Sequence, residues 1–160
     1  MKMNRIKTGL IALMAVIGLA SCETAQQKEK QTEAFVGEYT YETTGSADLY
    51  AGVVKLTTIP LNTTGSFSIV PCEEANRVAI VKGSDSIYAI VSGNDLYIEV
   101  PSLNYTYSDY FEVKLVFSGN KATRNEDNTI HWQSDVMAIG VYGSYSATGN
   151  GNIDLVATKQ

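Results

Sequence analysis

Residues 87–100 read IYAIVSGNDLYIEV, two runs of alternating apolar and polar residues around a short polar segment. In the second run, Leu96 and Ile98 fall on one side of an extended chain, and Tyr97 and Glu99 fall on the other. This period of two does not fit a helix. The intervening SGND favours a tight turn, because Gly and Asn tolerate the positive φ of hairpin turns. The stretch therefore predicts an antiparallel β-hairpin.

The same pattern continues on both sides of this hairpin. A second turn, Lys82-Gly83-Ser84-Asp85, precedes it and predicts a meander of strands near 77–81, 86–91 and 95–100. Further strands are predicted near 35–43, 49–58, 65–70, 110–118, 120–124, 129–135, 137–147 and 152–158. The inward side chains of the predicted core are Phe111, Val113, Leu115, Phe117, Ile130, Trp132, Leu96 and Ile98.

Short strands in series predict the fold class. The Gly149-Asn150-Gly151-Asn152 segment is the strongest turn signal and predicts a closing hairpin. After residue 34 no stretch has the apolar period of a three-turn helix. We therefore predict an all-β domain, either a single antiparallel up-and-down barrel or a barrel-like sandwich, and sequential hairpins favour the barrel.

The N-terminal segment is predicted to be a secretory signal peptide spanning 1–21. It has a basic start and then an uncharged run, residues 9–20, that is shorter than the ~20 residues of a membrane-spanning helix. Its end, Leu19-Ala20-Ser21-Cys22, resembles the lipobox of bacterial lipoproteins. That resemblance implies a mature protein beginning at an acylated, for example palmitate-bearing, Cys22. The alternative is an ordinary signal peptide ending near a cysteine.

Two further segments follow the signal peptide. Residues 22–34 are polar, and we predict a flexible tether there, since a helix would have no apolar stripe with which to dock. Residues 35–160 form the predicted β-domain. The lipobox-like end and the tether together predict a lipoprotein of the bacterial outer membrane, facing either the periplasm or the cell surface.

The lipobox-like end, the polar tether, the opening FVGEYTY at 35–41 and the serial hairpins resemble small calycin-like or lipocalin-like lipoproteins of the Bacteroides group. The likeness covers about 35–160. Lipocalins carry an early Gly-x-Trp, whereas this chain has Gly37-Glu38-Tyr39, and its one tryptophan is Trp132. The resemblance implies a calycin-like barrel and no particular activity.

Residue types that carry catalysis are sparse. The one histidine, His131, alternates with Ile130 and Trp132 and is predicted to face solvent in a row with Gln133 and Asp135. No Gly-x-Ser-x-Gly elbow is present. We therefore predict no enzyme activity and no catalytic residue.

Metal and thiol chemistry is not predicted either. The oxygen-rich segments 125–128 and 149–154 lack the spacing of a calcium-binding loop and are interpreted as turns. No metal site and no cofactor are predicted. Cys72 has no neighbouring cation in the sequence that would favour a reactive thiolate, which predicts a partly buried structural residue at a strand end.

The connection 101–110 is the predicted ligand site. It carries Tyr105, Tyr107 and Tyr110, whose flat rings suit sugar rings and peptide surfaces, and Asn104 and Asp109 add hydrogen-bonding groups. The alternative is that these tyrosines extend a strand edge and cover one end of the barrel. Separately, Asp85-Ser86-Ile87 resembles the O-glycosylation acceptor of exported Bacteroides-group proteins, which implies a modified Ser86.

The charge distribution limits the partners. The chain has 12 Lys and Arg against 17 Asp and Glu; three of the bases lie in 1–21, so nine bases remain and the rest has net charge −8. An acidic body disfavours nucleic acid. We predict a membrane-anchored, non-catalytic binding module for a small ligand, glycan or envelope protein. The alternative is a structural or inhibitor-like envelope protein with a filled core; the bulky inward residues favour a filled core.

Overall fold

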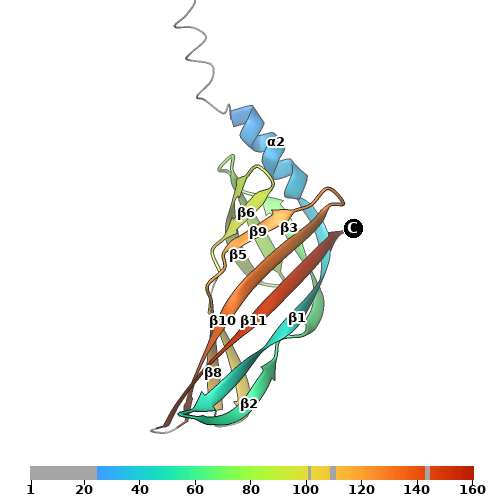
Figure 1. Ribbon diagram of the computed structural model, residues 1–160. Helices are drawn as coiled ribbons and strands as arrows, with labels where there is room; N and C mark the ends of the chain where they lie inside the picture. The colour runs from blue at the N-terminus through green and yellow to red at the C-terminus, as the bar shows by residue number, and fades with distance from the viewer. Residues whose placement is uncertain (1–24, 101, 109–110, 143–144) are drawn as a thin grey trace, which may run out of the picture.

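The computed structural model describes residues 25–100, 102–108, 111–142 and 145–160, in which one short helix precedes eleven strands (Figure 1). The elements are α2 (Ala25–Phe35), β1 (Gly37–Ala51), β2 (Val54–Pro60), β3 (Thr63–Pro71), β4 (Arg77–Lys82), β5 (Asp85–Ser92), β6 (Asp95–Ile98), β7 (Leu103–Ser108), β8 (Phe111–Phe117), β9 (Lys121–Arg124), β10 (Thr129–Tyr142) and β11 (Tyr145–Lys159).

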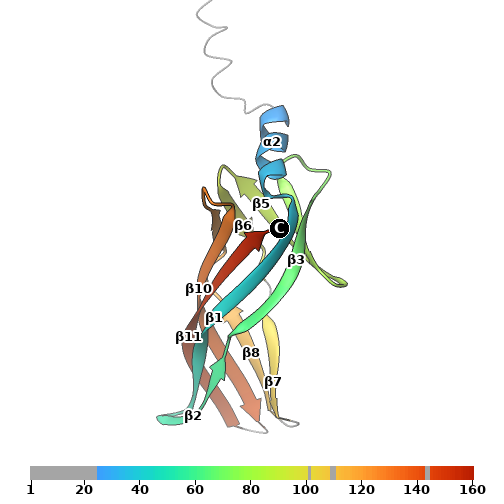
Figure 2. The same cartoon turned by 90° about the vertical axis from the view of Figure 1, so that its right-hand side faces the viewer.

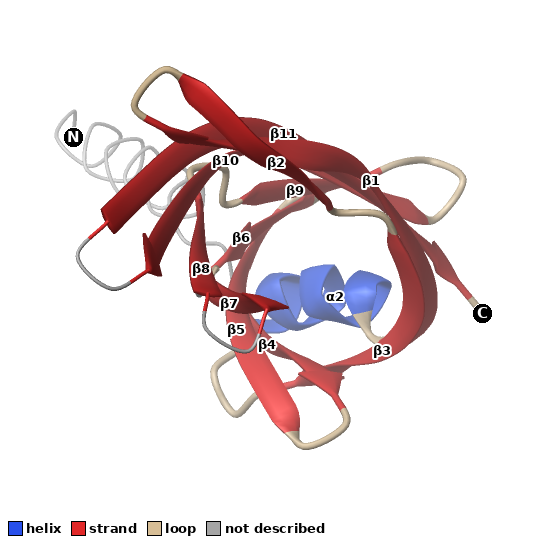
Figure 3. Cartoon of the chain, turned by 90° about the horizontal axis from the view of Figure 1, so that it is seen from below, coloured by secondary structure: helices blue, strands red, loops and turns tan. Residues whose placement is uncertain are grey.

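Eight of the strands close into an antiparallel barrel, in the order β11-β1-β3-β4-β5-β6-β9-β10, with β10 pairing back to β11. Figure 3 shows the ring from below. The predicted all-β, calycin- or lipocalin-like barrel is confirmed. The two hairpin turns that define the meander are also confirmed, since Gly83 and Gly93 have φ of 62° and 61°.

Three long strands, β1, β10 and β11, continue below the ring and build a second part of the sheet (Figures 1 and 2). There β2 pairs with β1, β8 pairs with β10, and β7 pairs with β8. This lower sheet has the order β2-β1-β11-β10-β8-β7 and is therefore bounded by the edges of β2 and β7. The same three strands serve both parts.

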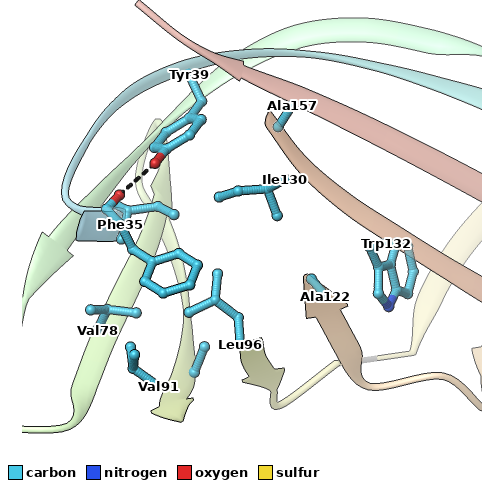
Figure 4. Close-up of a cluster of buried hydrophobic side chains, with 11 residues drawn as sticks. Phe35, Tyr39, Val78, Val91, Leu96, Ala122, Ile130, Trp132 and Ala157 are labelled. Carbon is cyan, nitrogen blue, oxygen red and sulfur yellow. Dashed lines mark hydrogen bonds between the residues drawn. The ribbon is translucent and has the colours of Figure 1, made fainter. Parts of the chain in front are cut away.

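Each part has its own apolar core. The upper core consists of Phe35, Tyr39, Ile69, Val78, Ala89, Val91, Leu96, Ala122, Ile130, Trp132 and Ala157 (Figure 4). The lower core consists of Ala47, Leu49, Ile59, Val113, Leu115, Val136, Ala138 and Ala147. Of the predicted core, five residues are buried and Phe111, Phe117 and Ile98 are partly buried against these clusters. The predicted inward face is therefore confirmed.

Helix α2 lies at the upper mouth of the barrel, where it contacts β3 and β5 (Figures 1 and 2). Its last residue, Phe35, is fully buried, and the Tyr39 hydroxyl donates to the Phe35 carbonyl oxygen at 2.7 Å (Figure 4). Thr32 is also buried. Much of the segment predicted as a flexible tether is thus helical, because the barrel supplies the apolar surface on which Phe35 packs.

Backbone groups beside β1 need other hydrogen-bond partners at the position where this strand changes its neighbour. One edge of β1 pairs with β3 through Thr43 and with β2 from Ser46 onward. Between them, Thr43 Oγ1 donates to the Leu61 carbonyl oxygen at 2.6 Å and accepts from the Thr63 backbone N–H at 3.0 Å. Thr43 is only 4% exposed. Its hydroxyl therefore pairs backbone groups that the strand ladder leaves open.

Strand β10 changes partner in the same way, from β9 to β8. The Gly119 backbone N–H donates to Ser134 Oγ at 2.8 Å, and the Gly119 carbonyl oxygen accepts from the Trp132 indole N–H at 2.9 Å. Ser134 is 6% exposed. A buried hydroxyl thus stands at each of the two positions where a long strand exchanges partners.

The predicted turn at 149–152 is wrong, because these residues lie inside β11. A Cβ on Gly149 would lie 1.6 Å from the Asp48 carbonyl oxygen, and one on Gly151 would lie 1.9 Å from that of Ser46. The glycines allow the backbone of β11 to pass close to β1. The same residue types that mark a turn mark a close strand contact here.

Three other predicted boundaries are corrected. Strands predicted at 129–135 and 137–147 form one strand up to Tyr142, and β1 runs through the predicted break after residue 43. The predicted connection at 101–110 contains strand β7. Long strands that pair with two partners in turn explain the first two differences.

We expect Thr43→Val to destabilise the domain by about 1–3 kcal/mol, because the Leu61 carbonyl and Thr63 N–H lose their partner inside the protein. Thr44→Val is the matched control, since its side chain is exposed on the same strand, and we expect a change within about 0.5 kcal/mol. Urea unfolding measures both values. Equal stabilities for the two variants would contradict the proposed role of Thr43 in pairing these backbone groups.

Candidate functional site

The structure describes part of the predicted tyrosine site. Tyr105 is partly buried against the lower core, whereas Asn104 is exposed on the opposite side of β7. Tyr107 lies in β7, and Asp109 and Tyr110 lie outside the described residues, as does Cys22. Tyr105 therefore packs against the lower core, and the ligand site at 101–110 stays a prediction.

Other residues singled out from the sequence lie on the surface. His131, Gln133 and Asp135 are exposed in one outward row, as predicted. Cys72 is a free, half-buried cysteine directly after β3, and Ser86 is exposed at the start of β5. Among the described residues, no three His, Cys, Asp or Glu side chains gather in a group that would hold a metal ion.

The outer wall of the barrel carries an exposed apolar and aromatic surface. Cross-strand pairs place it in two adjacent rows over β3, β4, β5 and β6. We name it the tyrosine patch, and it consists of Val70 and Tyr88 in one row, on either side of the buried Ala79, and of Arg77, Ile90 and Tyr97 in the other. Val70, Tyr88, Ile90 and Tyr97 are each 39–45% exposed. Large apolar side chains gathered in this way mark interaction surfaces.

Arg77 is held firmly inside the tyrosine patch. Its guanidinium lies 4.2 Å from the centroid of the Tyr88 ring, a cation–π contact. The same guanidinium forms ion pairs with Glu74 and Glu99, each at 3.6 Å. A ring on one side and two carboxylates restrict the rotamers of a long side chain. The three contacts therefore limit the freedom of the Arg77 side chain.

A second ion pair borders the patch beside Tyr97. Lys121 pairs with Tyr97 across the strands, and its Nζ lies 2.8 Å from Asp95 Oδ2. The hydrogen bond from Lys121, and then one from the Thr123 hydroxyl at 2.8 Å, lower the pKa of the Asp95 carboxyl. The patch is thus an apolar centre with a charged rim of both signs.

A polar groove of about 550 Å³ lies elsewhere, over β10 and β11. It is lined by Ser118, Gly119, Gln133, Ser134, Asp135, Asn152, Ile153 and Asp154. Gln133 Nε2 donates to Asp154 Oδ2 at 3.1 Å, so one of its carboxylates is already engaged within the wall. It lacks the aromatic surface of the tyrosine patch.

Sequence reasoning placed Tyr97 and Glu99 on the outer face and did not combine them with Tyr88 into a site. The available signal was the hairpin itself. Two neighbouring strands, each with an aromatic residue on its polar side, bring those rings together on the outside of the sheet. The contribution of Arg77, from the preceding strand, becomes evident only with the register of β4 and β5.

Comparisons with known proteins add little to this geometry. No protein-family model matches the chain, and no curated protein matches it. Among solved structures, the chain is similar to the ywiB protein from Bacillus subtilis at 13% identity, covering 81% of this chain and 98% of that chain, with a TM-score of 0.30. In the described ranges, no helix has the length and apolar character needed to span a bilayer.

We expect Lys121→Met to raise the pKa of Asp95 toward its ordinary value, because the largest cause of the lowered pKa is lost. The stabilisation that accompanies a lowered carboxyl pKa is present at neutral pH and is lost as the pH falls through the folded-state value. Carboxyl ¹³C shifts followed by NMR during acid titration measure the change. A pKa altered only by Thr123→Val would contradict this assignment of the cause.

Proposed function

We propose that this chain is a lipid-anchored, calycin-like protein of the bacterial cell envelope that acts as a non-catalytic binding module. The anchor is an acylated Cys22 at the outer membrane, with the domain facing either the periplasm or the cell surface. The ligand is a glycan or an envelope protein. The sequence that supports the anchor is the basic start, the apolar run and the terminal LASC. The acidic body disfavours nucleic acid as a partner.

The observation that carries the binding role is the contrast between the interior and the outer wall. Side chains from the helix and from the ring of strands pack into the upper core, with Phe35 and Tyr39 at most 1% exposed (Figure 4). Tyr88 and Tyr97, in contrast, are each 40% exposed on the outside. These facts favour a ligand that binds outside the barrel over a small molecule carried within it.

The composition of the tyrosine patch suits such a ligand. Tyrosine and arginine are the residues most enriched where binding energy concentrates, and a polar rim commonly surrounds them. Ile90 and Val70 add aliphatic surface, while Arg77 offers planar hydrogen-bond donors next to the Tyr88 ring. No step of this role needs a cofactor or a catalytic residue.

The anchor has a direct test. We expect mass spectrometry of membrane-extracted protein to find an N-terminal, acylated Cys22, because the LASC sequence supplies the small residues and the thiol that lipidation needs. Cys22→Ser should leave the protein unacylated and remove it from the detergent phase in phase partitioning. Normal processing and membrane retention of Cys22→Ser protein would contradict the anchor while leaving the patch untested by this measurement.

The tyrosine patch has a separate test in cells that express the full chain. A photo-crosslinking amino acid replacing Tyr97 should form adducts with the ligand. The same residue replacing Tyr50 is the matched control, because Tyr50 is a 36% exposed tyrosine on β1, outside the patch. Adding Tyr88→Ala should reduce the Tyr97 adduct about tenfold, since interface aromatics contribute on the order of 1–2 kcal/mol each. Equal adduct yields at 97 and 50 would contradict the site.

A further inference from the structure

The lower sheet ends in two strands, β2 and β7, and the chain treats their outer edges differently. Strand β2 carries Lys55 and Pro60, and its pairing with β1 is interrupted by a register shift. A lysine, a proline and a bulge are the features by which proteins prevent an edge strand from pairing with another chain. The edge of β2 is therefore protected against pairing with another chain.

The edge of β7 has neither the lysine nor the proline, although its pairing with β8 also shifts register, between Thr106 and Ser108. Its sequence, LNYTYS at 103–108, contains no charge and no proline. One edge pairs with β8, and no strand within the described ranges pairs with the other. Leu103, opposite the buried Leu115, is 52% exposed, so part of the lower core remains uncovered at this edge. Unpaired backbone groups and an uncovered apolar side chain fit an additional β-strand.

We propose that β7 pairs antiparallel with β7 of a second copy of this chain, with Tyr105 opposite Tyr105 at the twofold axis. This register places Asn104 of each copy opposite Thr106 of the other. Tyr105 and Leu103 then share the inner face, and Asn104 and Thr106 share the outer face, because pairing preserves the side on which a residue lies. Apolar residues meet apolar residues and polar residues meet polar residues.

The charges on β8 agree with this register, although three strand spacings of about 4.8 Å separate them and solvent screens their interaction. Lys114 lies beside Asn104, and Glu112 lies beside Thr106, both exposed on the outer face. Centring the pair on Tyr105 gives each outer row a Lys114 at one end and a Glu112 at the other. Centring it on Asn104 would place two Lys114 in one row, and centring it on Thr106 would place two Glu112 there. The Tyr105-centred register is the one with complementary charges.

An antiparallel pair turns the second barrel end over end, because the twofold axis stands perpendicular to the shared sheet. Helix α2 lies at the upper end of the barrel and β7 lies in the lower half (Figure 2). The two helices would therefore point in opposite directions. Combined with the proposed anchor, this geometry joins copies held on two facing membranes; that consequence depends on the proposed function, whereas the pairing itself does not.

Disulfide trapping tests the register in membrane-extracted, processed protein. In a Cys72→Ser background, Asn104→Cys with Thr106→Cys should give a covalent dimer on mild oxidation, since opposed Cβ atoms lie about 4.5–5.5 Å apart. Thr44→Cys with Ser46→Cys is the matched control, because both residues are exposed on β1, which has neighbours on both edges. Dimers in both variants, or in neither, would overturn the proposal. If the Cys72→Ser protein without added cysteines forms covalent dimers, they must join through Cys22. Cys22 would then be unacylated, which would count against the anchor.

A second measurement does not depend on cysteine chemistry. In sedimentation equilibrium, Asn104→Lys with Thr106→Lys should weaken dimerisation at least tenfold, because the new charges oppose each other across the axis. Thr44→Lys with Ser46→Lys should not. Phosphatidylcholine vesicles carrying the acylated protein should cluster, and the β7 lysine variant should abolish clustering. A chain that stays monomeric at millimolar concentration, or one that dimerises equally with the β7 lysines, would overturn the pairing; dimers in solution without vesicle clustering would overturn only the joining of membranes.

Discussion

Three strands belong to both the closed barrel and the lower sheet, and their backbone groups must stay paired where the strands pass from one to the other. This requirement governs the structure. Strands β1, β10 and β11 run through both the closed barrel and the lower sheet, so β1 and β10 must each exchange one neighbour for another along the same edge. An unpaired buried amide or carbonyl is costly, and Thr43 and Ser134 supply the missing partners at these two positions. Both cores depend on this solution, because their residues alternate along the same strands.

The side chains buried in the upper core, and the exposed rings outside it, favour a function at the surface. A carrier of small molecules needs enclosed space, whereas Phe35 and its neighbours pack inside the upper barrel (Figure 4). The two surfaces that remain use different chemistry. The tyrosine patch offers ordered side chains over the middle of a sheet, and the edge of β7 offers backbone groups. The first suits a ligand with its own hydrogen-bonding and apolar surface, and the second suits only an extended chain.

Much of the fold could be predicted from local alternation, as at Leu96 and Ile98 against Tyr97 and Glu99. The exchange of partners along β1 could not be predicted, because the role of Thr43 depends on where Leu61 and Thr63 lie when the chain comes back to β1. The glycines at 149 and 151 show a second limit, since turn propensity and tolerance of a close strand contact come from the same missing side chain. The packing of Tyr105 on the lower core could not be predicted either, because the position of that core depends on which strands pair.

Helix α2 has a mechanical consequence for an anchored molecule. Only Glu23 and Thr24 separate Cys22 from the first helical residue, Ala25. Three extended residue spacings reach about 10 Å, so an acyl chain at Cys22 would keep the first residue of the helix within about 10 Å of the anchored residue. The helix is joined to the barrel through buried Phe35 and behaves as a stiff stalk of about 16 Å, given 1.5 Å of rise per residue. The wall that carries Tyr88 and Tyr97 would then face sideways, and a ligand would approach parallel to the bilayer surface.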